Sequence, residues 1–127
     1  MPQDGKKPRV FVVDDETIIA TTLELILRRH GCKTYSFDRP LEALHFAHET
    51  PPDLLLSDVV MPVVSGIELA IKIREFCPTC KVLLFSGQSS TADLLARARA
   101  NGHNFEVLTK PVHPTDLLRK LHAQIGI

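Results

Sequence analysis

Short apolar runs alternate with longer amphipathic stretches five times along the chain, and this alternation constrains the fold more than any other feature. Each run has the length of a strand and is bounded by charged residues, Gly or Pro. Strands that alternate with helices predict βαβ units, and therefore a parallel sheet with helices on both of its faces. The expected strands cover residues 10–13, 34–37, 54–56, 82–85 and 105–108.

The segments between these runs carry apolar residues three and four positions apart, which is the spacing of helices that bury one face. Asp38 is a plausible N-cap of the second helix. Ser65 opens the third helix and is followed three residues later by Glu68, which is the pattern of a capping box. The expected helices cover about 16–30, 38–50, 65–78, 90–100 and 115 to the end of the chain.

The chain has 127 residues, of which 44% are hydrophobic, and this suits one domain with one core. Residues 1–8 are polar and are expected to form a flexible N-terminal arm, whereas residues 9–127 form the domain. The chain starts at Met1 and ends directly after the last helix, which favours a stand-alone domain over a piece of a longer protein.

Charge and cysteine content exclude several classes of function. Fifteen basic and fifteen acidic residues give a net charge of zero, which argues against direct binding of nucleic acid. No apolar run approaches the roughly 20 residues that cross a bilayer, so we expect no membrane insertion. An odd number of cysteines without a secretory signal favours a reducing compartment, and hence a cytoplasmic protein.

Polar residues follow all five expected strands, and those after four of them are candidate site residues, since Asp38 after the second strand is expected to cap a helix. Asp14 and Asp15 follow the first strand, Asp58 the third, Ser86 the fourth and Lys110 the fifth. In an open α/β sheet the ligand crevice lies outside the carboxyl ends of the strands. We therefore expect three carboxylates, a hydroxyl and an ammonium group at one edge of the sheet.

These side chains together indicate phosphoryl chemistry. Three neighbouring carboxylates repel one another unless a cation is present, and oxygen ligands without His or Cys select a hard cation such as Mg²⁺. A lysine beside them is a natural counter-charge for a phosphoryl group. The set reads as a carboxylate that accepts a phosphoryl group while a metal and a lysine stabilise it.

Four sequence blocks, in order and at similar spacing, resemble the response regulator receiver family, the family of the chemotaxis regulator. They are Val12-Val13-Asp14-Asp15-Glu16, then Leu55-Leu56-Ser57-Asp58-Val59-Val60-Met61-Pro62 with Gly66, then Ser86-Gly87, then Thr109-Lys110-Pro111. The resemblance covers about residues 9–125. It implies a doubly wound, flavodoxin-like α/β fold whose five parallel strands have the order 2-1-3-4-5.

The resemblance also implies roles for the acidic residues and their partners. Asp58 is the expected phosphoacceptor in a two-component phosphorelay, with a sensor histidine kinase or a phosphotransfer protein as the donor. Mg²⁺ would bind to Asp58, directly to Asp15, mainly through water to Asp14, and to the backbone carbonyl of Val60. Lys110 would pair with the phosphoryl group.

The resemblance also assigns residues that transmit the signal of phosphorylation or set its lifetime. Ser86 is the expected switch hydroxyl, and Pro111 is expected to follow a cis peptide bond. The family has an aromatic switch residue three positions before the lysine, where this chain has Val107, so either Phe105 replaces it through a bulge or the switch is altered. Gln88 and Val60 occupy positions that tune the lifetime of the phosphate.

The expected output surface is the face formed by the fourth helix, the fifth strand and the fifth helix. A downstream protein partner, or a phosphorylation-dependent dimer, would use this face. Such a protein is not an enzyme in the sense of turning over a separate substrate.

Two other functions are compatible with part of this pattern. A small phosphohydrolase could use an aspartate nucleophile on the first strand, but its motif needs an aspartate where Glu16 stands. A receiver-like binding module that is never phosphorylated would be expected to lack one or more of the five polar side chains.

Cys77-Pro78-Thr79-Cys80 is a CxxC sequence between the third helix and the fourth strand. Such a sequence can be a redox pair or half of a zinc site. No second CxxC or paired histidine completes a zinc site, and a thioredoxin-like pair would lie at the start of a helix instead. The location favours two ordinary cysteines, one of them partly buried.

Overall fold

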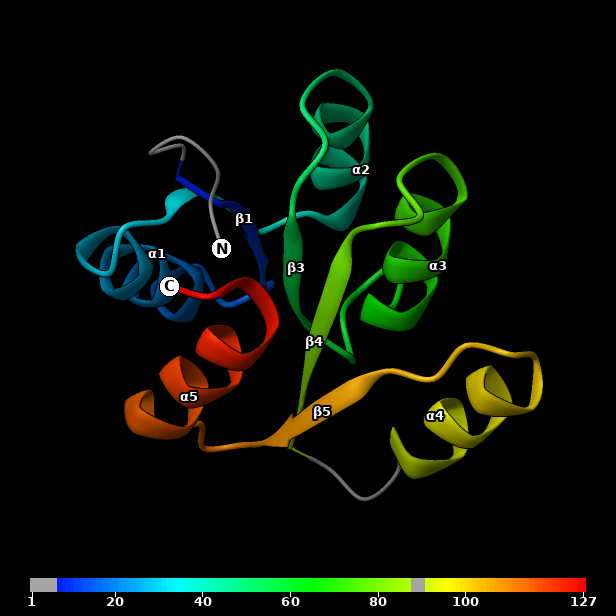
Figure 1. Cartoon of the computed structure of the whole chain (residues 1–127). Helices are drawn as coiled ribbons and strands as arrows, with labels where there is room; N and C mark the ends of the chain where they lie inside the picture. The colour runs from blue at the N-terminus through cyan, green and yellow to red at the C-terminus, as the bar shows by residue number, and fades with distance from the viewer. Residues whose placement is uncertain (1–6, 88–90) are drawn as a thin grey trace.

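The computed structural model describes residues 7–87 and 91–127, which form a parallel sheet of five strands in the order β2-β1-β3-β4-β5 (Figure 1). This order and the helices on both faces confirm the predicted flavodoxin-like fold. The strands are β1 (Arg9–Val13), β2 (Lys33–Phe37), β3 (Leu54–Asp58), β4 (Lys81–Ser86) and β5 (Glu106–Thr109). The helices are α1 (Thr17–Arg29), α2 (Pro40–Glu49), α3 (Gly66–Phe76), α4 (Thr91–Ala100) and α5 (Pro114–Ile125).

The centre of the sheet is apolar on both faces, as expected for parallel strands that are covered by helices. All five residues of β3 are buried, and so are the last four of β1. Side chains of neighbouring residues point to opposite faces, so that Leu55 contributes to one core and Leu56 to the other. The strand ends are therefore held at fixed positions.

Helices α1 and α5 cover one face of the sheet and α2, α3 and α4 cover the other (Figure 1). A hydrophobic core lies under each set of helices. One core lies under α1 and α5 and includes Leu27, Leu117 and Leu121. The other lies under α2, α3 and α4 and includes Ala47 and Ile73. The chain thus wraps both faces of the sheet and leaves the carboxyl ends of the strands accessible at one edge.

The ends of two helices show where local sequence decides the structure. The Ser65 hydroxyl accepts from the backbone N–H of Glu68, and the Glu68 carboxylate accepts from that of Ser65, which confirms the capping box. The predicted cap by Asp38 is wrong, since the N-cap of α2 is Arg39 and has no side-chain hydrogen bond. Asp38 instead accepts a hydrogen bond from the hydroxyl of Thr17, which links the residues after β1 and β2.

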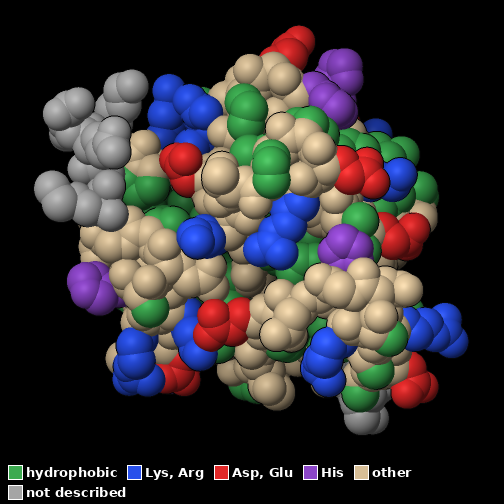
Figure 2. All heavy atoms as spheres, turned by 45° about the vertical axis from the view of Figure 1, so that its right-hand side comes forward, with side chains coloured by type: hydrophobic (Ala, Val, Ile, Leu, Met, Phe, Trp, Pro, Cys, Tyr) green, Lys and Arg blue, Asp and Glu red, His purple; other side chains and the backbone are tan. Residues whose placement is uncertain are grey.

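The folded part of the chain begins earlier than expected. Pro8, included in the predicted arm, is buried, and its carbonyl oxygen accepts a 2.8 Å hydrogen bond from the backbone of Lys33. Residues 1–6 lie outside the described part. Among the described helices, none has the length and apolar character needed to cross a membrane. On the face seen in Figure 2, acidic and basic side chains are interspersed.

Candidate functional site

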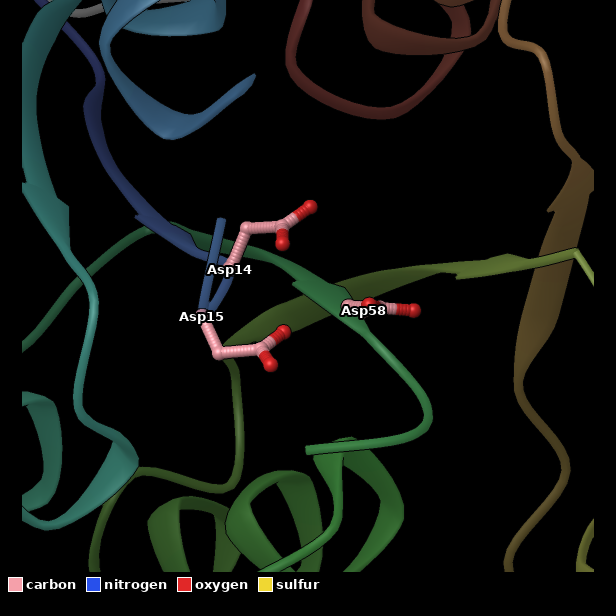
Figure 3. Close-up of side chains that lie close together, drawn as sticks. All are labelled: Asp14, Asp15 and Asp58. Carbon is pink, nitrogen blue, oxygen red and sulfur yellow. The ribbon is translucent and has the colours of Figure 1, made fainter. Parts of the chain in front are cut away.

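Three carboxylates meet at the carboxyl edge of the two central strands (Figure 3). Asp14 and Asp15 directly follow β1, and Asp58 is the last residue of β3. Because β1 and β3 pair in parallel, with Val13 opposite Ser57, their ends lie side by side. Each aspartate offers one oxygen, and these three oxygens lie within 4.8 Å of one another. The structure therefore brings together the three acidic residues that the sequence singled out.

Asp14 is the most enclosed of the three carboxylates, with no exposed surface. Its Oδ1 atom accepts a 2.9 Å hydrogen bond from the backbone of Glu16. Its Oδ2 atom is buried without a hydrogen-bond partner in the described part of the chain. Burial is the main reason why the pKa of Asp14 is raised above its ordinary value, and the charges of Asp58 and Asp15 add to the effect.

The donor set fits a hard divalent cation. A buried carboxylate oxygen without a hydrogen bond is costly unless a cation or a donor reaches it. All the candidate ligands are oxygens, which is what Mg²⁺ prefers. Asp14, Asp15 and Asp58 are thus suited to hold such an ion, whose charge would relieve their mutual repulsion.

Lys110 supplies the positive charge of the site from the other side. Its Nζ atom donates a 3.1 Å hydrogen bond to Asp58 Oδ2 and lies 3.8 Å from Asp14 Oδ2. Partial burial lowers the pKa of Lys110, but the hydrogen bond to Asp58 and the charge of Asp14 outweigh it and raise the pKa. The peptide bond between Lys110 and Pro111 is cis.

Ser86 and Lys110 are neighbours at the ends of β4 and β5. Ser86 pairs with Thr109 in the sheet, and its carbonyl oxygen accepts a 2.9 Å hydrogen bond from the backbone of Lys110. Gly87 lies against the Lys110 side chain, since a Cβ atom at Gly87 would stand 3.3 Å from Lys110 Cδ. The predicted hydroxyl and ammonium groups thus come from adjacent strand ends.

Gly66 has a packing role that the motif alone does not reveal. A Cβ atom at this position would overlap the backbone carbonyl of Asp58 and would lie 2.9 Å from the Ser57 hydroxyl oxygen. The backbone N–H of Gly66 also donates to the Val59 carbonyl at 2.9 Å. The first turn of α3 therefore rests directly on the end of β3.

The loop between Asp58 and Gly66 contains a strained residue. Val63 has φ 72°, and the backbone of Val64 donates a 2.8 Å hydrogen bond to the carbonyl of Pro62. This is a γ-turn with positive φ at its centre, a rare conformation for a β-branched residue. Valine is not a residue typical of turns, so this turn could not be predicted from the sequence.

The predicted switch positions lie on the outer part of the sheet. Val107 lies in β5 opposite Leu84, whereas Phe105 precedes the strand. The pairing from Glu106 to Thr109 is uninterrupted, so the suggested bulge is wrong. Phe105 instead packs beneath the guanidinium of Arg74, which lies 5.1 Å from the ring centroid. Gln88 lies outside the described residues.

An apolar groove between α1 and α5 adjoins Lys110. Ile18, at the start of α1, is 82% exposed and contributes to the wall of this groove. Residues from both helices and from the segment before α5 complete the lining, among them Leu23, Ile26, Val112 and Leu117. The site thus has an acidic centre and an apolar border.

Comparisons with known proteins agree with this fold. The family model described as "Response regulator receiver domain" matches residues 10–122. The chain is 30% identical over 120 residues to "Probable transcriptional regulatory protein TcrX" of Mycobacterium tuberculosis, covering 94% of this chain and 50% of that protein. It is also 30% identical over 117 residues to "Response regulator receiver protein CpdR" of Brucella abortus, covering 92% and 96%.

Among solved structures, chemotaxis protein CheY4 of Vibrio cholerae superposes with a TM-score of 0.82 at 26% identity, covering 94% of this chain and all of that one. The chain spans about half the length of TcrX and of the related transcriptional regulators that it matches. The shared part is the receiver portion, which the family model covers from residue 10 to residue 122. This chain therefore belongs to the response regulator receiver family of two-component signalling proteins.

Proposed function

We propose that this receiver is a cytoplasmic phosphorylation switch that accepts a phosphoryl group on Asp58 from the phosphohistidine of a sensor kinase or phosphotransfer protein. The observation that carries the proposal is the meeting of three carboxylate oxygens within 4.8 Å, with the Lys110 ammonium hydrogen-bonded to Asp58. Packing alone does not explain this arrangement, because burying each charged group loses free energy of solvation. The matched relatives are regulatory proteins, in keeping with signalling rather than turnover of a separate substrate.

The transfer is a displacement at phosphorus. A carboxylate oxygen of Asp58 forms the new bond while the bond between phosphorus and the donor nitrogen breaks, and the imidazole leaves with the electron pair. Lys110 is placed to move its hydrogen bond from the carboxylate to a phosphoryl oxygen. Asp14, Asp15, Asp58 and the Val60 carbonyl would hold Mg²⁺, which supplies positive charge beside the phosphoryl oxygens when bound.

The phosphoryl group also provides a signal. It replaces a single negative charge by a larger one and adds acceptor oxygens beside Ser86 and Lys110. Ser86 is the last residue of β4 and Lys110 directly follows β5, so reorienting them alters the face formed by α4, β5 and α5. Leu94 on α4 is 38% exposed and offers an apolar contact on this face for a downstream partner or a second copy. Val107, which lies in β5, would transmit the change, and Gln88 would tune the lifetime of the phosphate.

Exposed apolar side chains near the acidic residues suit a docked phosphodonor. Val60 and Val63, in the loop after Asp58, are 50% and 83% exposed, and Ile18 lies shortly after Asp15. We expect Ile18→Ser to slow transfer from a kinase about fivefold, because truncating an anchoring apolar contact at an interface costs about 1 kcal/mol. Phosphorylation by acetyl phosphate, which needs no docking, is expected to be unchanged.

The direct test is phosphorylation by acetyl phosphate with and without Mg²⁺, followed by intact mass measurement. We expect a single adduct of phosphoryl mass that requires Mg²⁺ and is absent in Asp58→Asn. No adduct in the wild type would favour a binding module that is not phosphorylated. Multiple turnover of a phosphate ester would favour the phosphohydrolase instead.

Lys110 provides a second test of the same site. We expect Lys110→Ala to slow adduct formation by about 100-fold, the usual effect of removing one group that stabilises transition-state charge. Lys120→Ala is the matched control, because Lys120 pairs with Glu106 at the sheet edge and not with the site. Equal rates for the two variants would exclude a role of Lys110 in the transfer.

A further inference from the structure

The CxxC sequence forms a tight turn at the end of the molecule opposite the acidic site. Helix α3 ends at Phe76 and strand β4 begins at Lys81, and the backbone N–H of Cys80 donates a 3.1 Å hydrogen bond to the carbonyl of Cys77. In such a four-residue turn the first and last Cα atoms lie within about 7 Å. Disulfides join Cα atoms that are about 4.4–6.8 Å apart, so the backbone of this turn is suited to one.

Both cysteine side chains turn toward the same hydrophobic core. Cys80 is 1% exposed in the core under α2, α3 and α4, and Cys77 packs against that core. Cys32, the third cysteine, belongs to the core on the opposite face of the sheet. The sheet therefore separates Cys32 from the pair and leaves Cys77 and Cys80 as partners for each other.

The two thiols differ in access. Cys77 is partly exposed, whereas Cys80 is buried. Burial, with a smaller contribution from Cys77, raises the pKa of the Cys80 thiol to about 12. An oxidant in solution therefore meets Cys77 first, and Cys80 reacts only with a sulfur that is already beside it.

We propose that Cys77 and Cys80 form a reversible intramolecular disulfide when a low-molecular-weight disulfide, such as glutathione disulfide, oxidises the protein. The Cys77 thiolate attacks one sulfur of the oxidant, and a glutathione thiolate leaves. The Cys80 sulfur gives up its proton to the released glutathione thiolate, attacks Cys77 Sγ and releases the second glutathione thiolate. The protein loses two protons and two electrons in total, and the oxidant takes them up to give two molecules of glutathione.

This disulfide would link helix α3 covalently to strand β4, and both elements extend from the turn to the acidic site. Helix α3 runs from Gly66, which rests on the Asp58 carbonyl, to the turn, and β4 runs from the turn to Ser86. Arg74 of α3 already donates a 3.1 Å hydrogen bond to the Cys80 carbonyl. The covalent link would fix the same junction and raise the melting temperature, without touching the residues that bind phosphate.

The test is incubation with glutathione disulfide, unfolding, alkylation of the remaining thiols, intact mass measurement and peptide mapping. We expect the wild type and Cys32→Ser to lose two alkylation sites and to yield a Cys77–Cys80 linked peptide. Cys80→Ser is expected to stop at a glutathione adduct on Cys77, and Cys77→Ser is expected to stay unmodified at Cys80. Circular dichroism shows whether each variant is folded.

Two results would overturn the proposal. One is a stable glutathione adduct on wild-type Cys77 that never gives way to the internal disulfide. The other is a wild-type chain that keeps three free thiols under conditions that oxidise a small dithiol completely. Since the readout is the state of the thiols, it is independent of whether Asp58 accepts a phosphoryl group.

Discussion

Strands β3 and β5 contribute the two oppositely charged partners of the site, but they differ in how firmly they are held. All five residues of β3 are buried, and the strand pairs with β1 and β4 on its two sides. Strand β5 has four residues, none of them fully buried, and pairs with β4 alone. Asp58 is thus fixed at the centre of the sheet, whereas Lys110 extends from its edge.

This difference indicates how the domain separates chemistry from signalling. Segments with few buried apolar contacts open at lower free energy than the centre of a core. The acceptor carboxylate keeps its position on β3, and the counter-charge lies on a strand that can shift when the phosphoryl group arrives. The hydrogen bond between Lys110 and Asp58 connects the two regions.

The largest expected effect comes from the same substitution made in both strands. Leu56 of β3 and Leu108 of β5 contribute to the same core, but Leu56 is buried and Leu108 is partly exposed. We expect Leu56→Ala to lower the free energy of unfolding by about 3 kcal/mol and Leu108→Ala by about 1 kcal/mol, because the cost depends on the cavity that is left. Urea denaturation measures both values. Equal losses of unfolding free energy in the two variants would contradict the claim that β3 is held more firmly than β5.

A methyl group under Asp58 tests how tightly the centre is packed. Gly66→Ala places a Cβ atom in the space of the Asp58 carbonyl, and we expect a loss of about 2 kcal/mol together with slower phosphorylation. Gly102→Ala is the matched control, because a Cβ atom there meets nothing, although φ is +88°. The control is expected to lose about 1 kcal/mol and to keep its phosphorylation rate. A Gly66→Ala protein that behaves like the control would contradict this account of packing.

The charge buried at Asp14 makes the metal-free protein sensitive to pH. Because burial raises the pKa of Asp14 above 3.8, stability is lost as pH rises from that value through the raised pKa. Asp14→Asn keeps an acceptor for the Glu16 N–H and carries no charge, so we expect it to be more stable by about 1 kcal/mol at pH 7. Thermal unfolding without metal measures the difference, which should shrink at acidic pH and when Mg²⁺ is added to the wild type. A constant difference at all pH values would show that charge is not the cause.

The smallest expected effect concerns the strained turn beside the site. Val63→Gly removes a β-branched side chain from a left-handed conformation, and we expect a gain of about 0.5 kcal/mol, since the greater freedom of the unfolded Gly offsets part of the relief. Val60→Gly, in the same loop and without positive φ, is expected to lose stability instead. Chemical denaturation distinguishes the two, and a loss of stability in Val63→Gly would mean that the turn is not strained.

The sequence predicted the sheet well because each central strand is a continuous apolar run that ends in a charged residue. Asp14, Asp15 and Asp58 follow such runs, and the order of the strands brings them together. The cap of α3 was predictable because Ser65 and Glu68 act through local hydrogen bonds. Features of this kind depend on neighbours in the sequence.

Contacts between distant segments could not be predicted in the same way. Asp38 was expected to cap α2, but its carboxylate bonds with Thr17, which is 21 positions away. The strand β5 starts one residue later than its apolar run suggests, because Phe105 packs against Arg74 of α3. Val63 adopts positive φ in the short connection between Asp58 and the helix that rests on it. In each case tertiary packing decides the local structure.

The most direct test of the account is a comparison of amide NMR spectra in the presence of Mg²⁺, with and without beryllofluoride, which mimics the aspartyl phosphate. We expect shifts at Asp58 and Asp15 in the centre, and further shifts at Ser86, Lys110 and Val107 toward the edge, with none of them in Asp58→Asn. An unchanged wild-type spectrum, or the same shifts in Asp58→Asn, would contradict the claim that a phosphoryl group on Asp58 moves the edge of the sheet.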